Sequence, residues 1–312
     1  MITYESTFAR YLEGGYMHMG SKQTAILLMC GSACVIPVVD TIAKALTEVA
    51  SPFFLVAVRY AIGAALAAVV FRSPRRALRS LASAPVLHFG RSGLLVAAMV
   101  SFYWAISSLS VATALGGYFT GPVIAAVLSI VLLGERARAS TLLAVVLGFL
   151  GALFILRPDN SITYGSVFAL LSGILSGFYL VLTRAASLSV RAEDNVLIQS
   201  IVGAALIAPI AAVNVPAVDL TILCLMVLMG VLSFAAHGLF LAAFRILDVG
   251  TLAPLAYLEI AIAALLGWAI FGDLPTILAW VGIVCVVTAG LLIAVTPAPS
   301  ELTTGKMNVQ SR

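Results

Sequence analysis

The chain has 312 residues, of which 62% are hydrophobic and 10% are charged, and its formal net charge is +4. A soluble domain carries about 25% charged residues, and a soluble fold of this length could not hide so much apolar surface from water. The composition therefore excludes a soluble globular protein and predicts an all-α membrane protein with several transmembrane helices.

The first 23 residues differ from the rest of the chain. Residues 1–23 are mostly polar, and we expect them to form a cytoplasmic N-terminal tail. Met17 and Met19 lie in this tail, so the sequence leaves the start of translation open. The apolar stretch 24–46 is longer than the apolar core of a signal peptide, which is about 7–15 residues. We therefore interpret it as the first transmembrane helix.

Continuous apolar stretches follow one another along the chain. A helix needs about 20 apolar residues to cross a bilayer, and strands of a membrane barrel would alternate instead. We predict ten transmembrane helices, at residues 24–46, 52–72, 86–108, 111–133, 139–156, 163–183, 195–214, 220–244, 250–271 and 276–295. Residues 297–312 are expected to form a cytoplasmic C-terminal tail.

The basic residues predict the orientation. Ten spans place both termini on one side, and if that side is the cytoplasm, 14 of the 17 Lys and Arg residues fall on cytoplasmic segments. They are Arg10, Lys22, Arg72, Arg75, Arg76, Arg79, Arg91, Arg136, Arg138, Arg184, Arg191, Arg245, Lys306 and Arg312. Lys44 and Arg157 remain outside, and Arg59 lies within a span. This excess follows the positive-inside rule and explains the net charge without a nucleic-acid partner.

The chain also contains an internal repeat. Residues 102–135 fall on residues 240–273 without a gap when they are shifted by 138 positions. The match predicts a first five-helix repeat at 24–157 and a second at 163–296. Because five is odd, the second repeat enters the membrane upside down. Inverted repeats of this kind are typical of secondary transporters, whose substrate site lies near the midplane between the repeats.

The sequence resembles the EamA family of the drug/metabolite transporter superfamily. The resemblance rests on the two repeats, on "VLLGE" at 131–135 and "AIFGD" at 269–273, on Arg59 early in the second span, and on Pro122 midway through the fourth. It implies movement of small organic solutes by alternating access. The second repeat departs from the pattern, since Ile260 stands opposite Pro122.

Three charged residues lie at similar depth in the first two spans. Asp40 and Lys44 are four positions apart on one helix face, and Arg59 lies about 10 Å from the outer surface. They form either a charged lining of a solute pathway or an Asp40–Arg59 lock between helices, with Lys44 reaching the surface. In the first reading Arg59 attracts a carboxylate, or Asp40 accepts a proton or an amine.

Two further titratable residues lie deep within spans. Glu259 has no basic residue within a helical turn, and a carboxyl group in such surroundings is able to exchange protons near neutral pH. We expect it to couple protons or bind a substrate amine, unless it is a protonated structural acid. His237 is either a proton relay or a neutral packing residue.

Polar and aromatic residues within spans are candidates for the lining of a solute site. Gln199 occupies roughly the place in the seventh span that Arg59 holds in the second, so the two halves differ chemically. The aromatic candidates are Tyr103, Trp104, Tyr179 and Tyr257, with Tyr118 and Phe119 beside them. Their rings line a cavity or pack against lipid and other helices.

Two small-residue motifs predict close helix contacts. Gly117 and Gly121 lie in the fourth span, and Gly173 and Gly177 lie in the sixth. Glycines four apart let helices approach closely in a membrane. We interpret the motifs as seams at which the two halves can rock.

The sequence therefore predicts a secondary transporter of the cell inner membrane. The solute would be an amino-acid-like compound, a metallophore or a riboflavin-like vitamin. The alternatives are an intramembrane enzyme, for which the HExxH, GxSxG and paired-Asp motifs are missing, and a non-transporting membrane subunit. We expect no cofactor and no metal, because the four cysteines lack His or acidic neighbours at ligand spacing. A homodimer is left open.

Overall fold

The computed structural model describes residues 22–70, 74–133, 139–156, 162–187, 192–213, 215–244, 246 and 255–295. Within these ranges the regular structure is entirely helical. The predicted N-terminal tail up to residue 21 and the C-terminal tail lie outside the described residues, as do Glu135 and Arg157.

The helices follow the predicted spans closely. In the first repeat they are α2 (Lys22–Leu46), α3 (Pro52–Val70), α4 (Pro74–Ser83), α5 (Pro85–Ile106), α6 (Val111–Tyr118), α7 (Gly121–Leu133) and α8 (Ala139–Leu156). In the second they are α9 (Tyr164–Ser187), α10 (Ala192–Ala211), α11 (Leu220–Phe244), α13 (Leu258–Phe271) and α14 (Ile277–Val295). Of the described helices, α2, α3, α5, α9, α10 and α11 are long and apolar enough to cross a membrane, and shorter apolar helices fill the remaining predicted spans. The count of ten spans stays a prediction.

Helix α4 was not predicted. It carries exposed Arg75 and Arg79, while Ala77 is 3% exposed and packs with Leu81 against α10. Ala77 and Leu81 are four positions apart, so they share one face of a helix. This spacing was the available signal for a short amphipathic helix at the membrane surface.

The fourth predicted span is broken into α6 and α7. Pro122 lies in the first turn of α7, where its missing N–H is tolerated, but its ring would clash with a carbonyl in a continuous helix. At the break, the Thr120 hydroxyl donates to the Gly117 carbonyl at 2.7 Å. The interruption therefore places the start of a helix at mid-span.

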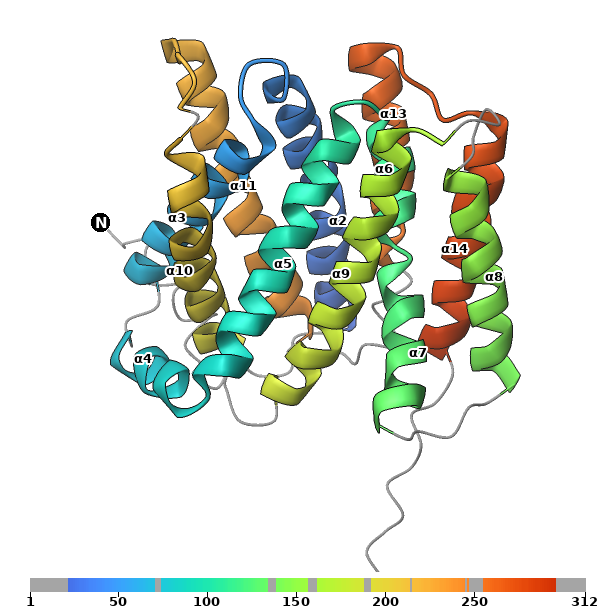
Figure 1. Cartoon of the computed structure of the whole chain (residues 1–312), viewed down its shortest axis with the longest axis horizontal. Coiled ribbons are helices and arrows are strands. Elements are labelled where there is room, and N and C mark those ends of the chain that lie inside the picture. Colours follow the sequence, from blue (N-terminus) through green and yellow to red (C-terminus); the bar gives the residue numbers. More distant parts are fainter. Residues whose placement is uncertain are drawn as a thin grey trace, which may run out of the picture.

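The helices pack mainly between the two repeats (Figure 1). Helix α5 packs on α9 as α11 packs on α2, and α6 and α7 pack on α9 as α13 packs on α2. Helix α3 packs on its counterpart α10, and α8 packs on α14. Exchanging the repeats reproduces these pairs, which is the pattern expected of pseudo-two-fold symmetry.

Equivalent helices run in opposite directions. Lys44, near the end of α2, donates to the carbonyl of Leu109, and Gly165, at the start of α9, faces the Leu109 side chain. The end of α2 and the start of α9 therefore share one end of the bundle, which we call the Lys44 end (upper in Figure 1). Helices α4, α5 and α10 begin at the opposite end, which we call the Arg91 end.

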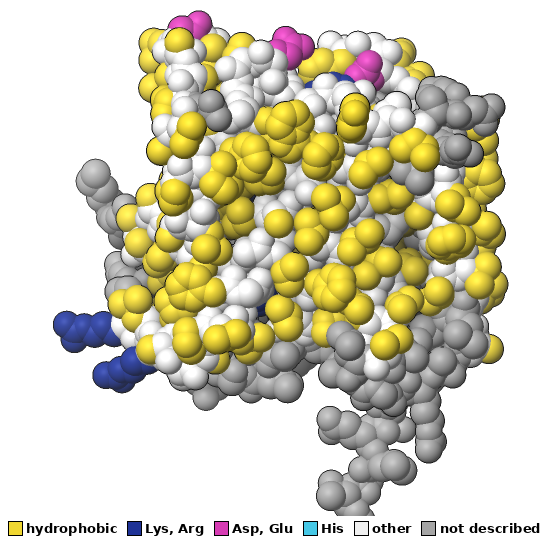
Figure 2. Space-filling model, in the orientation of Figure 1, with side chains coloured by type: hydrophobic (Ala, Val, Ile, Leu, Met, Phe, Trp, Pro, Cys, Tyr) yellow, Lys and Arg dark blue, Asp and Glu magenta, His cyan; other side chains and the backbone are white. Residues whose placement is uncertain are grey.

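The surface is apolar over most of the visible face (Figure 2). Large side chains such as Phe149 and Leu265 are 64% and 59% exposed. Acidic side chains lie along the upper edge of this face, and basic side chains project at the lower left. A broad apolar belt between charged rims is the surface expected of a protein embedded in lipid.

The predicted glycine seam is present between the repeats. A Cβ atom on Gly173 of α9 would collide with the Gly117 carbonyl and the Thr120 hydroxyl. A Cβ on Gly121 would lie 3.1 Å from the Gly173 carbonyl oxygen. The two motifs therefore pack against each other where α6, α7 and α9 cross.

Candidate functional site

Asp40, Arg59 and Tyr103 meet in the interior between α2, α3 and α5. Asp40 is 3% exposed, and its Oδ1 lies 4.0 Å from Nη1 of Arg59. The same Nη1 donates to the Tyr103 hydroxyl at 3.1 Å. The structure therefore brings together three of the residues predicted from the sequence, and it pairs the buried acid with the buried base.

Local features of α2 and α11 support this group. Pro37 interrupts the hydrogen bonding of α2 one turn before Asp40, and the Thr41 hydroxyl donates to the Pro37 carbonyl at 2.7 Å. Across the interface, the Tyr103 hydroxyl lies 3.9 Å from the sulfur of Met229 in α11. The second repeat thus forms one wall of the group.

Glu259 lies in the first turn of α13 and is 8% exposed. Asp40 and Arg59 are its charged neighbours. Within the described part of the chain, none of the ion pairs includes Glu259. The positive end of the helix dipole favours a carboxylate at this position. Glu259 is therefore a buried acid from the second repeat beside the Asp40–Arg59 pair.

The two repeats meet at Phe119 and Tyr257. These residues are equivalent under the shift of 138 positions, and their ring centroids are 5.1 Å apart. Contact between equivalent residues places them close to the pseudo-two-fold axis. The same shift relates Gly121, where α7 begins, to Glu259, so both repeats start a helix at this level.

Lys44 belongs to a different contact from the one predicted. Its Nζ pairs with Asp273 and donates to the Leu109 carbonyl at 2.9 Å, and it lies 5.1 Å from the centre of the Phe271 ring. Lys44 is therefore neither part of the Asp40–Arg59 pair nor a lone side chain that reaches the surface. It links the end of α2 to the segment after α13.

The remaining candidates divide between the interior and the surface. Tyr179 of α9 donates to Oε1 of Gln199 in α10 at 2.8 Å. Trp104 is 40% exposed and stacks on Phe168, with centroids 5.9 Å apart. Neighbouring helical residues point in directions about 100° apart, so Tyr103 faces the interior and Trp104 does not. The expectation that Trp104 lines the site is not supported.

His237 lies in α11 and is partly buried. Its Nδ1 lies 3.0 Å from the carbonyl of Ser233, one turn earlier in the same helix. This contact suits an Nδ1–H donor, which leaves Nε2 as an acceptor. Arg59 is its charged neighbour. His237 is thus near the site, with one nitrogen held by its own helix.

Arg91 and His88 were missed by the sequence analysis. Arg91 was expected at the cytoplasmic surface, and His88 was not singled out. Both are 1% exposed, and Arg91 Nη2 donates to the Asn195 carbonyl of α10 at 3.3 Å. The signal for their burial was the spacing of His88, Arg91 and Leu95 along one face of α5.

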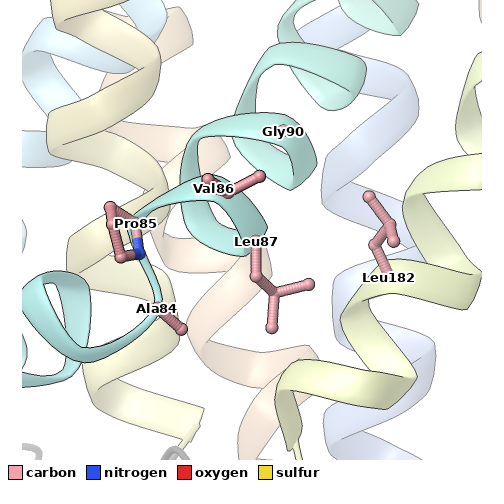
Figure 3. Close-up of a pocket in the computed structure, with 6 residues that line it drawn as sticks. All are labelled: Ala84, Pro85, Val86, Leu87, Gly90 and Leu182. Atoms are coloured by element: carbon pink, nitrogen blue, oxygen red, sulfur yellow. The ribbon is translucent and has the colours of Figure 1, made fainter.

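A groove of about 620 Å³ lies at the Arg91 end (Figure 3). It is lined by Ala84, Pro85, Val86, Leu87, Gly90 and Leu182. These side chains are all apolar, and none belongs to the site above. In the described part of the chain, no three His, Cys, Asp or Glu residues are grouped in a way that could hold a metal ion. The buried charges between the repeats are therefore the candidate functional site.

Comparisons with known proteins find transporters among the relatives of this chain. A riboflavin transporter of Brucella anthropi is 27% identical over 232 residues, covering 72% of this chain and 80% of the relative. A riboflavin transporter of Rhizobium johnstonii is 29% identical over 167 residues, covering 52% of this chain and 54% of the relative. An S-adenosylmethionine uptake transporter of Rickettsia bellii is 26% identical over 212 residues, covering 68% of this chain and 73% of the relative.

A solved crystal structure shares the fold, with a TM-score of 0.57 and 20% identity, and the match covers 87% of this chain and 96% of that one. Two repeats, an apolar surface and buried ionic groups at the repeat interface define a multi-pass membrane protein of the transporter class. The chain belongs to the EamA-like transporter family, whose sequence pattern matches residues 23–157 and 163–295. The family and its bacterial relatives place it in the cell inner membrane.

Proposed function

We propose that the protein is a secondary transporter that moves a small organic metabolite by alternating access. The observation that carries this proposal is the group formed by Asp40, Arg59, Tyr103 and Glu259, which draws on both repeats and is closed off from lipid. Buried ionic groups in a membrane protein mark solute or ion pathways. A site between inverted repeats is contacted by both halves, so rocking of one half against the other can expose it to either side.

The site has two chemically different parts. The Arg59 guanidinium is suited to a carboxylate or carbonyl oxygen, and the rings of Tyr103, Phe119 and Tyr257 are suited to a flat body. Amino-acid-like compounds and riboflavin-like vitamins both fit this description, whereas a metallophore is a third candidate without a specific contact. The names of the relatives make riboflavin and S-adenosylmethionine the first solutes to test.

We propose that the Arg91 end faces the cytoplasm. Exposed Arg75 and Arg79 lie at this end, whereas exposed Glu48 and Asp219 lie at the Lys44 end. This distribution follows the positive-inside rule. The orientation, together with ten spans, puts both termini in the cytoplasm.

The function is tested by flux into proteoliposomes with an imposed pH gradient. Glu259→Gln keeps the size of the side chain but cannot exchange a proton. We expect the wild type to accumulate riboflavin or S-adenosylmethionine in response to the gradient, and E259Q to lose that response. Glu48→Gln changes an exposed acid at the Lys44 end and should behave as wild type. A pH response in E259Q equal to that of the wild type would refute the coupling role of Glu259.

A further inference from the structure

The starts of α5 and α10 enclose buried polar atoms that the proposed site does not use. Arg91 and His88 are each 1% exposed, and Ser92 is fully buried. Within the described residues, His88 Nδ1, Arg91 Nε, Ser92 Oγ and Asn195 Oδ1 have no hydrogen-bond partner. Three of these residues share one face of α5. We call these four residues the Arg91 cluster.

Arg91 has no anionic partner in the described part of the chain. Its Nη2 donates to the Asn195 carbonyl at 3.3 Å. The carboxylate of Asp194 is held instead by Arg76, at 2.6 Å. Where the structure describes the chain, the titratable neighbours of Arg91 are His88, Tyr60 and Tyr179. None of these side chains carries a negative charge at neutral pH with its ordinary pKa.

This arrangement is unfavourable unless an anion joins it. Desolvating a guanidinium without a counter-ion destabilises the fold, and unsatisfied buried polar groups are rare enough to need an explanation. The Nε–Nη2 edge of a guanidinium matches the two oxygens of a carboxylate. Among the residues that the structure describes, that edge of Arg91 makes one long hydrogen bond, and its Nε–H has no partner.

The cluster is connected to the site between the repeats. Tyr60 is an electrostatic neighbour of both Arg59 and Arg91. Tyr179 is likewise a neighbour of Arg91 and pairs with Gln199. Tyr60 is therefore close to both arginines, and Tyr179 is close to Arg91.

We propose that the Arg91 cluster binds the carboxylate of the transported solute. It would be a second binding site, between the Asp40–Arg59 site and the Arg91 end. This inference rests on the proposed transport function. Arg91 holds the carboxylate through its free edge, and His88 and Ser92 donate further hydrogen bonds to it. The solute then passes from one arginine to the other as the bundle opens at the Arg91 end.

The test is thermal unfolding of the full chain in lipid-free detergent, with acetate as the carboxylate probe and chloride as the reference at equal ionic strength. For the wild type, acetate at ten times its Kd raises the folding equilibrium constant about elevenfold. Arg91→Met loses this response. Without acetate it unfolds at a higher temperature than the wild type, because it lacks the uncompensated charge. Arg79→Met, which replaces an exposed arginine of α4, should respond as the wild type does.

Equal acetate responses in the wild type and R91M would overturn the proposal, as would a lower melting temperature of folded R91M without acetate. Either result would mean that Arg91 has only a structural role, through its hydrogen bond to the Asn195 carbonyl. If R91M does not fold, Arg91→Lys keeps the charge without the planar fork. R91K must then respond to acetate more weakly than the wild type, and an equal response would overturn the proposal.

A second arm separates a solute carboxylate from a lipid headgroup. The measurement is repeated in phosphatidylcholine vesicles with and without phosphatidylserine. Stabilisation by phosphatidylserine that depends on Arg91, with no response to acetate, would assign the cluster to lipid and overturn the solute assignment. Flux of S-adenosylmethionine, the candidate solute that carries a carboxylate, can fail while the acetate response persists, so failure of the proposed function is recognised separately.

Discussion

At the scale of single residues, the candidate site depends on buried charges that balance one another. Nη1 of Arg59 lies 4.0 Å from Oδ1 of Asp40, and the same nitrogen donates a hydrogen bond to the Tyr103 hydroxyl. Removing one member of a buried ion pair leaves the other without compensation, which destabilises a protein by about 3–5 kcal/mol. Removing both members is tolerated better, because no isolated charge remains.

The Asp40–Arg59 pair therefore predicts a specific pattern in a double-mutant cycle. Asp40→Asn should lower the melting temperature more than the double variant Asp40→Asn/Arg59→Gln does. Tyr103→Phe should have a smaller effect than D40N, because it removes one hydrogen bond to a charged group, about 1.5–3 kcal/mol. Thermal unfolding of the purified variants checks both expectations. If the stability lost in the double variant equals the sum of the losses in D40N and in Arg59→Gln alone, the two charges do not interact.

At the scale of the helices, glycines set how closely the two repeats approach. Gly117 and Gly173 bring α6 and α9 so close that neither position has room for a Cβ atom. The breaks before α7 and α13 place helix starts at matched depths in the two repeats. The close seam at Gly117 and Gly173 therefore lies next to the start of α7.

Substitution of Gly173 should disrupt this seam. Gly173→Ala places a Cβ atom against the Gly117 carbonyl, so we expect lower stability and lower solute flux. The matched control is Gly63→Ala in α3, where the new Cβ would meet only Ser200 Oγ at 3.6 Å. Alanine in a helix is favoured over glycine by about 0.5–1 kcal/mol, so G63A should be at least as stable as the wild type. Melting temperatures of G173A and G63A that do not differ would contradict this account of the seam.

At the scale of the whole molecule, an ion pair joins the repeats at each end of the bundle. Lys44 and Asp273 pair at the Lys44 end, and Arg76 and Asp194 pair at the Arg91 end. Each pair connects a residue of the first repeat with one of the second. In a transporter that alternates between two open forms, such contacts must break and re-form during every cycle.

The Lys44–Asp273 pair can be tested by exchanging its charges. Lys44→Asp and Asp273→Lys should each reduce solute flux, because each places two like charges where an ion pair closes the bundle. The double exchange should recover part of the flux. The recovery should be incomplete, because Lys44 also donates to the Leu109 carbonyl. A double variant no more active than the single ones would argue against closure by this pair.

The sequence by itself determined the class of the protein, its two repeats and most of its helices. Hydropathy is sufficient for this because every span must supply its own backbone hydrogen bonds in lipid. The shift of 138 positions also paired Phe119 with Tyr257, and the structure brings these two rings into contact. For the site, the sequence placed Asp40, Arg59 and Tyr103 among the candidates, because charged and polar residues within apolar spans are conspicuous.

Only the tertiary structure decided which side chains face one another. In water, the polar face of a helix marks its outer side, but in a bilayer both the lipid and the protein interior are apolar, and this signal is lost. The sequence therefore did not separate Tyr103 from Trp104, or pair Lys44 with Asp273. It also placed Arg91 at the surface, because a basic residue near the end of a span looks the same whether it faces water or a neighbouring helix.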